Sequence, residues 1–157
     1  MTEDANKFLV RRFLEEIWND RRLHVADEVF ASDCVSHQLR SGGELTMPRG
    51  PQEIKRHITE WLEAFPDIRF TIERILAEAD YVMTNCLAKG THLGNWHGIP
   101  ATGKEITIQM SVVHRIEEEK IVEDWVLVDF LGVFQQLGIV RPTIELLNKS
   151  AEVKETH

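Results

Sequence analysis

The sequence contains little cysteine and no long apolar run. Cys34 and Cys86 are its only cysteines, far apart and in no metal-binding or redox spacing. A small secreted domain usually carries more cysteine, so a reducing compartment is expected. The first residues lack the basic and apolar segments of a signal peptide, and no apolar run approaches the roughly 20 residues that span a bilayer. We therefore expect a cytoplasmic protein with no membrane partner.

Basic residues are also in short supply. The chain has 18 Lys and Arg against 26 Asp and Glu, a formal net charge of −8 with histidine neutral. This charge would repel a polyanion on average, which argues against nucleic acid as the main partner. Motifs for a nucleophile elbow, a phosphate-binding loop or a dinucleotide site are absent, and His92 and His97 do not have the spacing of a metal site. We expect no metal and no cofactor.

The length of 157 residues and the ordinary globular composition indicate one domain. Apolar residues recur with a helical period up to Phe65 and with a period of two from Ile68 onward. This change predicts an α+β domain: N-terminal helices packed on a curved antiparallel sheet, with a short helix at the end. The predicted helices cover about residues 3–18, 25–30, 51–65 and 130–137, and the predicted strands about 68–78, 81–92, 104–116 and 120–131. Residues 33–37 are predicted to be a short extended segment and residues 40–48 a loop. Residues 1–140 would form the domain and residues 141–157 a tail, helical or loosely attached.

Long strands usually curve, and helices packed on one face of such a sheet leave a conical pocket. The last predicted strand carries large apolar residues on both of its faces. We therefore expect the outer face of the sheet to be covered as well, by a second subunit in a homodimer or homotetramer.

Asp129 stands out because it interrupts the apolar segment 126–131. Strand alternation puts it on one face with Trp125 and Leu127. A carboxylate in such surroundings has a raised pKa and can exchange protons near neutral pH. Asp is equally a favoured N-cap, here for the short helix that follows. The position alone leaves the two interpretations even.

Other candidates for a pocket are histidines and aromatic residues. His114 shares a strand face with Met110, and the hairpin register puts it opposite about residue 123; a lone histidine on an apolar face is more often part of the core. His92 precedes a loop rich in glycine and proline, and Trp96 lies within it. Such a loop suits a planar guest but also suits a simple turn. Trp61 lies on the inner stripe of a helix, where a core role is the simpler interpretation.

An ordered set of motifs resembles the SnoaL-like polyketide cyclases, also called ester cyclases, of the nuclear transport factor 2-like superfamily. The resemblance covers about residues 6–138. Its motifs, in chain order, are Trp18-Asn19, His37, Ala64-Phe65-Pro66-Asp67, Gly90-Thr91-His92, Ile99-Pro100-Ala101-Thr102-Gly103-Lys104, Lys120-Ile121-Val122-Glu123-Asp124-Trp125, Asp129 and Gln135-Gln136-Leu137-Gly138. The turn Glu117-Glu118-Glu119-Lys120 departs from the family's usual Asp-Gly or Asn-Gly.

The resemblance implies a cone-shaped barrel and a cofactor-free intramolecular aldol condensation of a small apolar or aromatic polyketide-like ester. It also implies catalytic roles for Asp129, as general acid/base, and for His114. Substrate-binding roles follow for His37, His92, Trp96 and Trp125, to which we add Trp61 and Met110. An isomerase, dehydratase or epoxide hydrolase on the same scaffold, or a non-catalytic binding module, are the alternatives.

Overall fold

The computed structural model describes residues 1–40 and 42–147. Three helical segments open the chain: α1 (Glu3–Arg12) with its π-helical continuation η1 (Phe13–Asn19), then the short η2 (Leu23–Val25) and α2 (Ala26–Val29). The hydroxyl of Thr2 caps α1 by accepting from the Ala5 amide, and Glu3 and Asp4 lie in its first turn. The longer helix α3 (Pro51–Ala64) begins with a proline at its first position.

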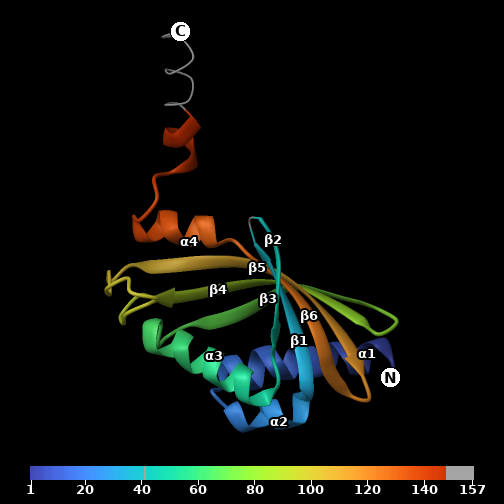
Figure 1. Cartoon of the computed structure of the whole chain (residues 1–157). Coiled ribbons are helices and arrows are strands. Elements are labelled where there is room, and N and C mark those ends of the chain that lie inside the picture. The colour runs from blue at the N-terminus through green and yellow to red at the C-terminus, as the bar shows by residue number, and fades with distance from the viewer. Residues whose placement is uncertain (41, 148–157) are drawn as a thin grey trace.

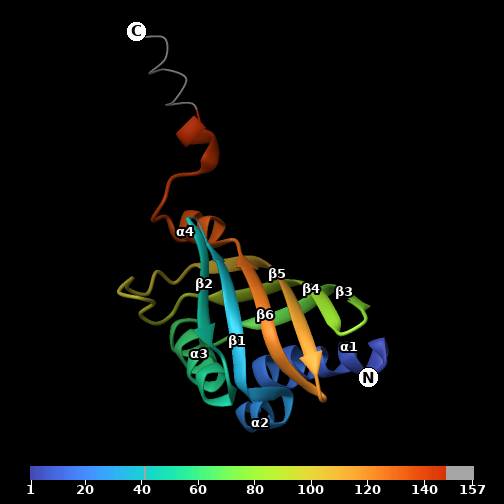
Figure 2. The same cartoon turned by 45° about the vertical axis from the view of Figure 1, so that its right-hand side comes forward.

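Six strands form one curved sheet in the order β2-β1-β6-β5-β4-β3. Their bounds are β1 (Phe30–Arg40), β2 (Gly43–Pro48), β3 (Arg69–Glu78), β4 (Tyr81–Thr91), β5 (Glu105–Glu117) and β6 (Lys120–Val128). Neighbouring strands pair antiparallel except β1 and β6, which run parallel. Figure 2 shows the strands side by side. The sheet is curved but not closed, with β2 and β3 at its edges, so the predicted α+β fold is confirmed without a closed barrel.

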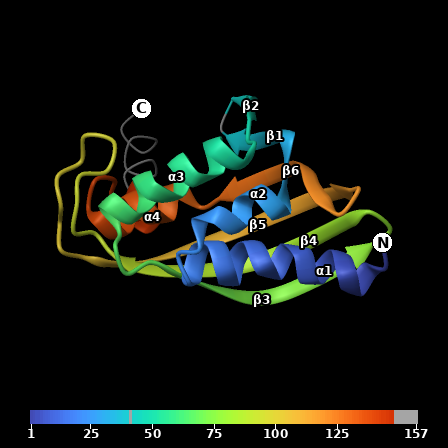
Figure 3. The ribbon, with the colours of Figure 1, turned by 90° about the horizontal axis from the view of Figure 1, so that it is seen from below.

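The helices α1, α2 and α3 cover the concave face of the sheet (Figures 1 and 3). Helix α4 (Phe130–Leu137) lies against β5, and Gly138 ends it in a left-handed conformation. In Figure 3 the loop between β4 and β5 lies near α4 and the C-terminal end of α3. The amides of Leu93 and Gly94 donate to the Ala64 carbonyl and fix this loop to α3.

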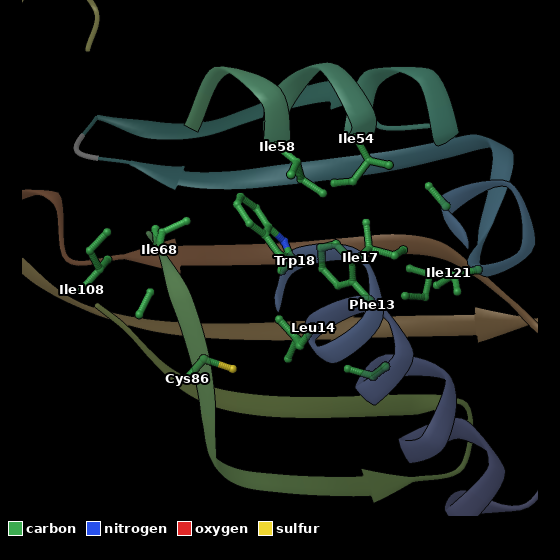
Figure 4. Packing of buried hydrophobic residues seen from close by; sticks show 14 of the residues in the cluster. Phe13, Leu14, Ile17, Trp18, Ile54, Ile58, Ile68, Cys86, Ile108 and Ile121 are labelled. Carbon is green, nitrogen blue, oxygen red and sulfur yellow. The ribbon is translucent and has the colours of Figure 1, made fainter. Parts of the chain in front are cut away.

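The hydrophobic core lies between these helices and the sheet. Figure 4 shows side chains from η1, from α3 and from the strands converging on one volume. Ile17, Ile54, Ile58 and Ile121 are fully buried there. Burying a large aliphatic side chain contributes about 1.5–3 kcal/mol, so this layer stabilises the packing of the helices on the sheet.

Two predicted elements differ in the structure. Residues 40–48, predicted to be a loop, contain strand β2, which pairs with β1 to extend the sheet. Gly42 in the turn before β2 and Gly43 at the first position of β2 both have positive φ angles, while Pro48 is tolerated at the end of an edge strand. Of the predicted tail, Thr143 to Leu147 are helical, and residues 148–157 lie outside the described residues. No helix in the described part of the chain is long and apolar enough to cross a membrane.

Candidate active site

A cavity opens between the helical layer and the concave face of the sheet. Apolar side chains make up most of its wall, from η1 and α3 on one side and from β3, β4, β5 and β6 on the other. These apolar residues are Phe13, Leu14, Trp18, Trp61, Ile68, Phe70, Cys86, Ala88, Ile108, Met110, Val112, Val126, Val128 and Phe130. The polar residues of the wall are Gln38, Arg49, His57, Thr84, His114 and Asp124. A few polar groups within an apolar wall are typical of a small-molecule site.

Among the residues that the structure describes, Asp124 is the only carboxylate in the cavity wall. It lies on β6 with 2% of its surface exposed, directly opposite His114 of β5 in the strand register. Its Oδ1 accepts a short hydrogen bond from the Ser36 hydroxyl, and Gln38 Nε2 donates to Ser36 Oγ over 2.9 Å. Ser36 and Gln38 alternate with outward residues on β1, which runs alongside β6, so the β1–β6 pairing orients this carboxylate.

His114 lies beside Asp124 and is almost completely buried. Desolvation lowers its pKa to about 4, with the positive charge of Arg49 acting in the same direction and Asp124 acting against it. The imidazole is therefore neutral at physiological pH. Its Nδ1 has no hydrogen-bond partner among the described residues, and Phe13 packs edge-on against the ring. A neutral imidazole therefore lies in the cavity wall next to a carboxylate.

Two further polar residues reach the cavity from the helical side. His57 of α3 packs edge-on against Trp18, and desolvation lowers its pKa to about 3. Arg49 lies between β2 and α3 and is 8% exposed. Both were missed from the sequence. Nothing in the pattern around Arg49 marks it as buried, whereas His57 did carry a signal, because it lies three residues after Ile54 and four before Trp61, on the apolar stripe of α3. The sequence did contain a sign of Asp124, because strand alternation puts it on the same face of β6 as Val126 and Val128.

Asp129 lies outside this cavity, contrary to the expectation that it points into it. Its carboxylate caps α4, accepting from the Gly132 amide over 2.8 Å, and it lines a shallow groove on the other face of the sheet with Gln109, Ser111 and Leu127. Strand alternation correctly put Asp129 on the face of Leu127. Because both faces of β6 are apolar, the pattern did not show that the inner face is instead the one that carries Asp124. The catalytic role of Asp129 stays a prediction that its position does not support.

Two other predicted pocket residues lie on the outer face. His37 stacks on Trp125 at a centroid distance of 5.1 Å, and Glu123 and Glu44 bind its ring nitrogens at 2.8 and 2.7 Å. The hydrogen bond to Glu123 raises the pKa of His37, followed by that to Glu44. The expectation that His37 and Trp125 line the inner pocket is wrong, because the alternation of β1 and β6 turns Gln38 and Asp124 inward instead.

His92 and Trp96 are buried, but neither belongs to the cavity wall. His92 stacks on Phe65 and its Nδ1 lies 3.1 Å from the hydroxyl of Thr102, so it fixes the loop between β4 and β5. Trp96 packs against Trp61 and Phe130, with centroid distances of 5.2 and 6.3 Å. Trp96 therefore supports two residues of the wall from behind, and the expectation of direct contact with the pocket is wrong for both residues.

Three predicted residues, His114, Trp61 and Met110, do lie in the cavity wall. Their contact with a substrate remains a prediction. Within the described ranges, no group of three or more histidine, cysteine, aspartate or glutamate side chains is placed to hold a metal ion. What the arrangement offers chemically is a proton acceptor, a neutral imidazole and a cation inside an apolar chamber.

Comparison with known proteins gives one consistent result. Residues 8–137 match the SnoaL-like polyketide cyclase family. The aklanonic acid methyl ester cyclase DnrD of Streptomyces peucetius is 32% identical over 145 residues, covering 87% of this chain and 93% of DnrD. Among solved structures, IdmH of Streptomyces antibioticus is 27% identical with a TM-score of 0.73, covering 85% of this chain and 98% of IdmH.

A more distant structure shares the fold alone. AclR of Streptomyces galilaeus is 22% identical, with a TM-score of 0.79 over 99% of this chain and 95% of AclR. The family match spans the helices, the sheet and every polar residue of the cavity wall. The chain belongs to the SnoaL-like polyketide cyclase family.

Proposed function

We propose that this protein is a cofactor-independent cyclase that closes a ring in an aromatic polyketide ester by intramolecular aldol condensation. The observation that carries the proposal is the pairing of Asp124 with His114 in an apolar cavity. The relation to DnrD supports the substrate class, because DnrD is a cyclase of aklanonic acid methyl ester.

The reaction needs a base, an acid and a folded substrate. In the proposed mechanism, Asp124 takes a proton from an activated methylene between two carbonyls, and the resulting enolate delocalises into the substrate's own carbonyl groups. The enolate carbon attacks a second carbonyl of the same molecule, forming the carbon–carbon bond and an alkoxide. Asp124 returns its proton to that alkoxide, so atoms and charge balance without a cofactor.

His114 would stabilise the developing alkoxide. Because its pKa lies at about 4, the ring is neutral at pH 7 and can donate one N–H hydrogen bond. A donor aimed at a developing oxyanion typically contributes about 100-fold to 1,000-fold in kcat. The apolar wall would hold the chain in a folded conformation, and such proximity lowers barriers by several kcal/mol.

The experiment is turnover of aklanonic acid methyl ester by the purified protein. Cyclisation conserves mass, so product is separated chromatographically and its new ring identified by NMR. We expect the wild type to form the cyclic product and His114→Gln to lose about 100-fold in kcat. Glu118→Gln, at the exposed tip of the β5–β6 hairpin, is the matched control and should keep full activity.

Two results would count against the proposal. The protein would be a binding module if it bound aklanonic acid methyl ester but converted neither this ester nor any of a panel of related β-dicarbonyl polyketide esters. Full turnover by His114→Gln would remove His114 from the mechanism.

A further inference from the structure

Arg49 is a buried cation that has no counter-ion in contact with it among the residues that the structure describes. The residue is 8% exposed, its side chain lines the inner cavity, and its Nε has no hydrogen-bond partner. Among the residues that the structure describes, no carboxylate forms an ion pair with it within 4 Å. Arginine is almost never buried without a partner, because an isolated charge is costly to remove from water.

The backbone holds Arg49 in this place. Its amide donates to the Cys34 carbonyl over 2.7 Å. The next residue, Gly50, packs so closely on β1 that a Cβ there would lie 2.5 Å from the Ser32 carbonyl oxygen. The segment between β2 and α3 is thus fixed against β1, and its arginine is directed inward by the fold.

The other polar groups of the wall do not neutralise Arg49 by contact. Within the described ranges Asp124 is the one carboxylate in the wall. It attracts Arg49 electrostatically, but its hydrogen bond comes from Ser36. His57 and His114 are neutral at pH 7, and the positive charge of Arg49 helps to keep them so. The cavity therefore has a base on the sheet side and an unsatisfied cation at the junction of β2 and α3.

We propose that Arg49 binds an anionic oxygen of the ligand. The ligand class is an aromatic molecule with a carboxylate, or one that develops an enolate oxygen during reaction. A guanidinium presents its donors in a planar fork that matches a carboxylate, and hydrogen bonds between charged groups are the stronger ones. The inference deepens the proposed function and rests on it, because the proposed function identifies the cavity as the substrate site.

The first test measures binding of 2-naphthoate and of methyl 2-naphthoate by calorimetry. We expect wild type to bind the anion at least about tenfold more tightly than the ester, because a hydrogen bond between charged groups is stronger than one to a neutral ester. Arg49→Gln should lose this preference while binding the ester within about twofold of wild type. Arg56→Gln is the matched control: Arg56 lies on the exposed side of α3, paired with Glu60, and its loss should change neither affinity.

A second variant and a second probe complete the design. Arg49→Lys keeps the positive charge but loses the planar pair of donors, so it should retain part of the preference for naphthoate over the ester. This variant replaces Arg49→Gln in the test if Arg49→Gln fails to fold. The probe 4-nitrophenol separates the two sources of negative charge. If wild type, but not Arg49→Gln, raises the phenolate fraction of bound 4-nitrophenol at fixed pH, Arg49 stabilises an oxyanion that forms in the cavity. A preference for naphthoate alone indicates a carboxylate already present on the ligand.

The inference is overturned if wild type neither prefers naphthoate to its methyl ester nor raises the phenolate fraction of bound 4-nitrophenol. It is also overturned if Arg49→Gln and Arg49→Lys keep both of these effects. These binding measurements require no turnover, so they are independent of the proposed function. A protein that binds naphthoate through Arg49 but converts no polyketide ester would contradict the cyclase proposal and leave this inference standing.

Discussion

At the scale of single residues, Asp124 and Asp129 have unlike surroundings although they lie five positions apart. Asp124 is buried against Ser36 and the cavity, and Asp129 holds the first turn of α4. Proton transfer to a ligand in the cavity requires a carboxylate within hydrogen-bond reach. Of the two, Asp124 alone lies in the wall of that cavity, so the proposed catalytic role belongs to Asp124 and the capping of α4 to Asp129.

The capping role of Asp129 predicts a specific pattern of stability. Asp129→Ala should lower the free energy of unfolding by about 1 kcal/mol, because the Gly132 amide loses its acceptor. Asp129→Asn should cost much less, since asparagine caps nearly as well. Urea denaturation checks both variants. Equal stability of wild type and Asp129→Ala would contradict the capping role.

At the scale of elements, the outer face of β1, β2 and β6 is held together by a charged cluster. His37 of β1 lies between Glu44 of β2 and Glu123 of β6, and Arg115 of β5 donates to the other oxygen of Glu123. The parallel strands β1 and β6 lie far apart in the sequence. The contact between His37 and Glu123 therefore helps to hold the register of the two strands.

This cluster has a predicted pH dependence. The raised pKa of His37 means that its protonated form stabilises the fold at pH values below the unfolded pKa of about 6.5. That stabilisation is lost as pH rises through the folded-state pKa. An NMR titration should place the His37 midpoint above 6.5, and Glu123→Gln should lower it. A wild-type midpoint at or below 6.5 would show that the cluster does not hold the charged imidazole.

The elements show what sequence patterns can and cannot establish. The change of period at Ile68, the two successive strands predicted over about 68–78 and 81–92, and the helix over Phe130–Leu137 follow from local chemistry, and the structure confirms them. Strand β2 was missed because its glycines and proline indicate a loop, whereas pairing with β1 is a tertiary contact.

The candidate site shows the same limit. Alternation shows which residues of β6 share a face. It does not show which face is the inner one, because one face carries valines and the other carries Trp125 and Leu127. His114 could be proposed because a histidine interrupts an apolar face. Arg49 could not, because its burial depends on the packing of the segment before α3 against β1.

At the scale of the whole molecule, the buried neutral histidine links the site to global stability. An unfolded histidine titrates near 6.5, whereas the pKa of His114 in the folded protein is about 4. Between these values the unfolded chain binds a proton that the folded chain does not, so stability is full above about 6.5 and falls as pH decreases toward 4.

Urea midpoints measured between pH 7 and pH 4.5 test this prediction. His114→Gln should show a shallower decline than wild type, because one proton-linked step is removed. His24→Gln, which alters an exposed histidine, is the control and should decline as wild type does. An unchanged decline in His114→Gln would argue against a buried neutral imidazole.

The outer face of the sheet supports the expected self-association, which remains a prediction. Several large apolar side chains are exposed there, among them Met83 on β4 and Leu127 on β6, the latter 51% exposed. Contiguous exposed apolar surface marks interaction sites. Light scattering should give the mass of a dimer or tetramer, and Leu127→Arg should shift it toward the monomer. A monomeric wild type at micromolar concentration would contradict the prediction.

The most direct measurement compares kcat for Asp124→Asn and Asp129→Asn on one accepted polyketide ester. Both substitutions remove a carboxylate and keep its shape, and asparagine preserves the cap on α4. If the inner carboxylate moves the proton, Asp124→Asn should lose at least about 100-fold in kcat, and Asp129→Asn should stay within about threefold of wild type. Full activity of Asp124→Asn, with activity lost in Asp129→Asn, would place the chemistry on the other face of the sheet.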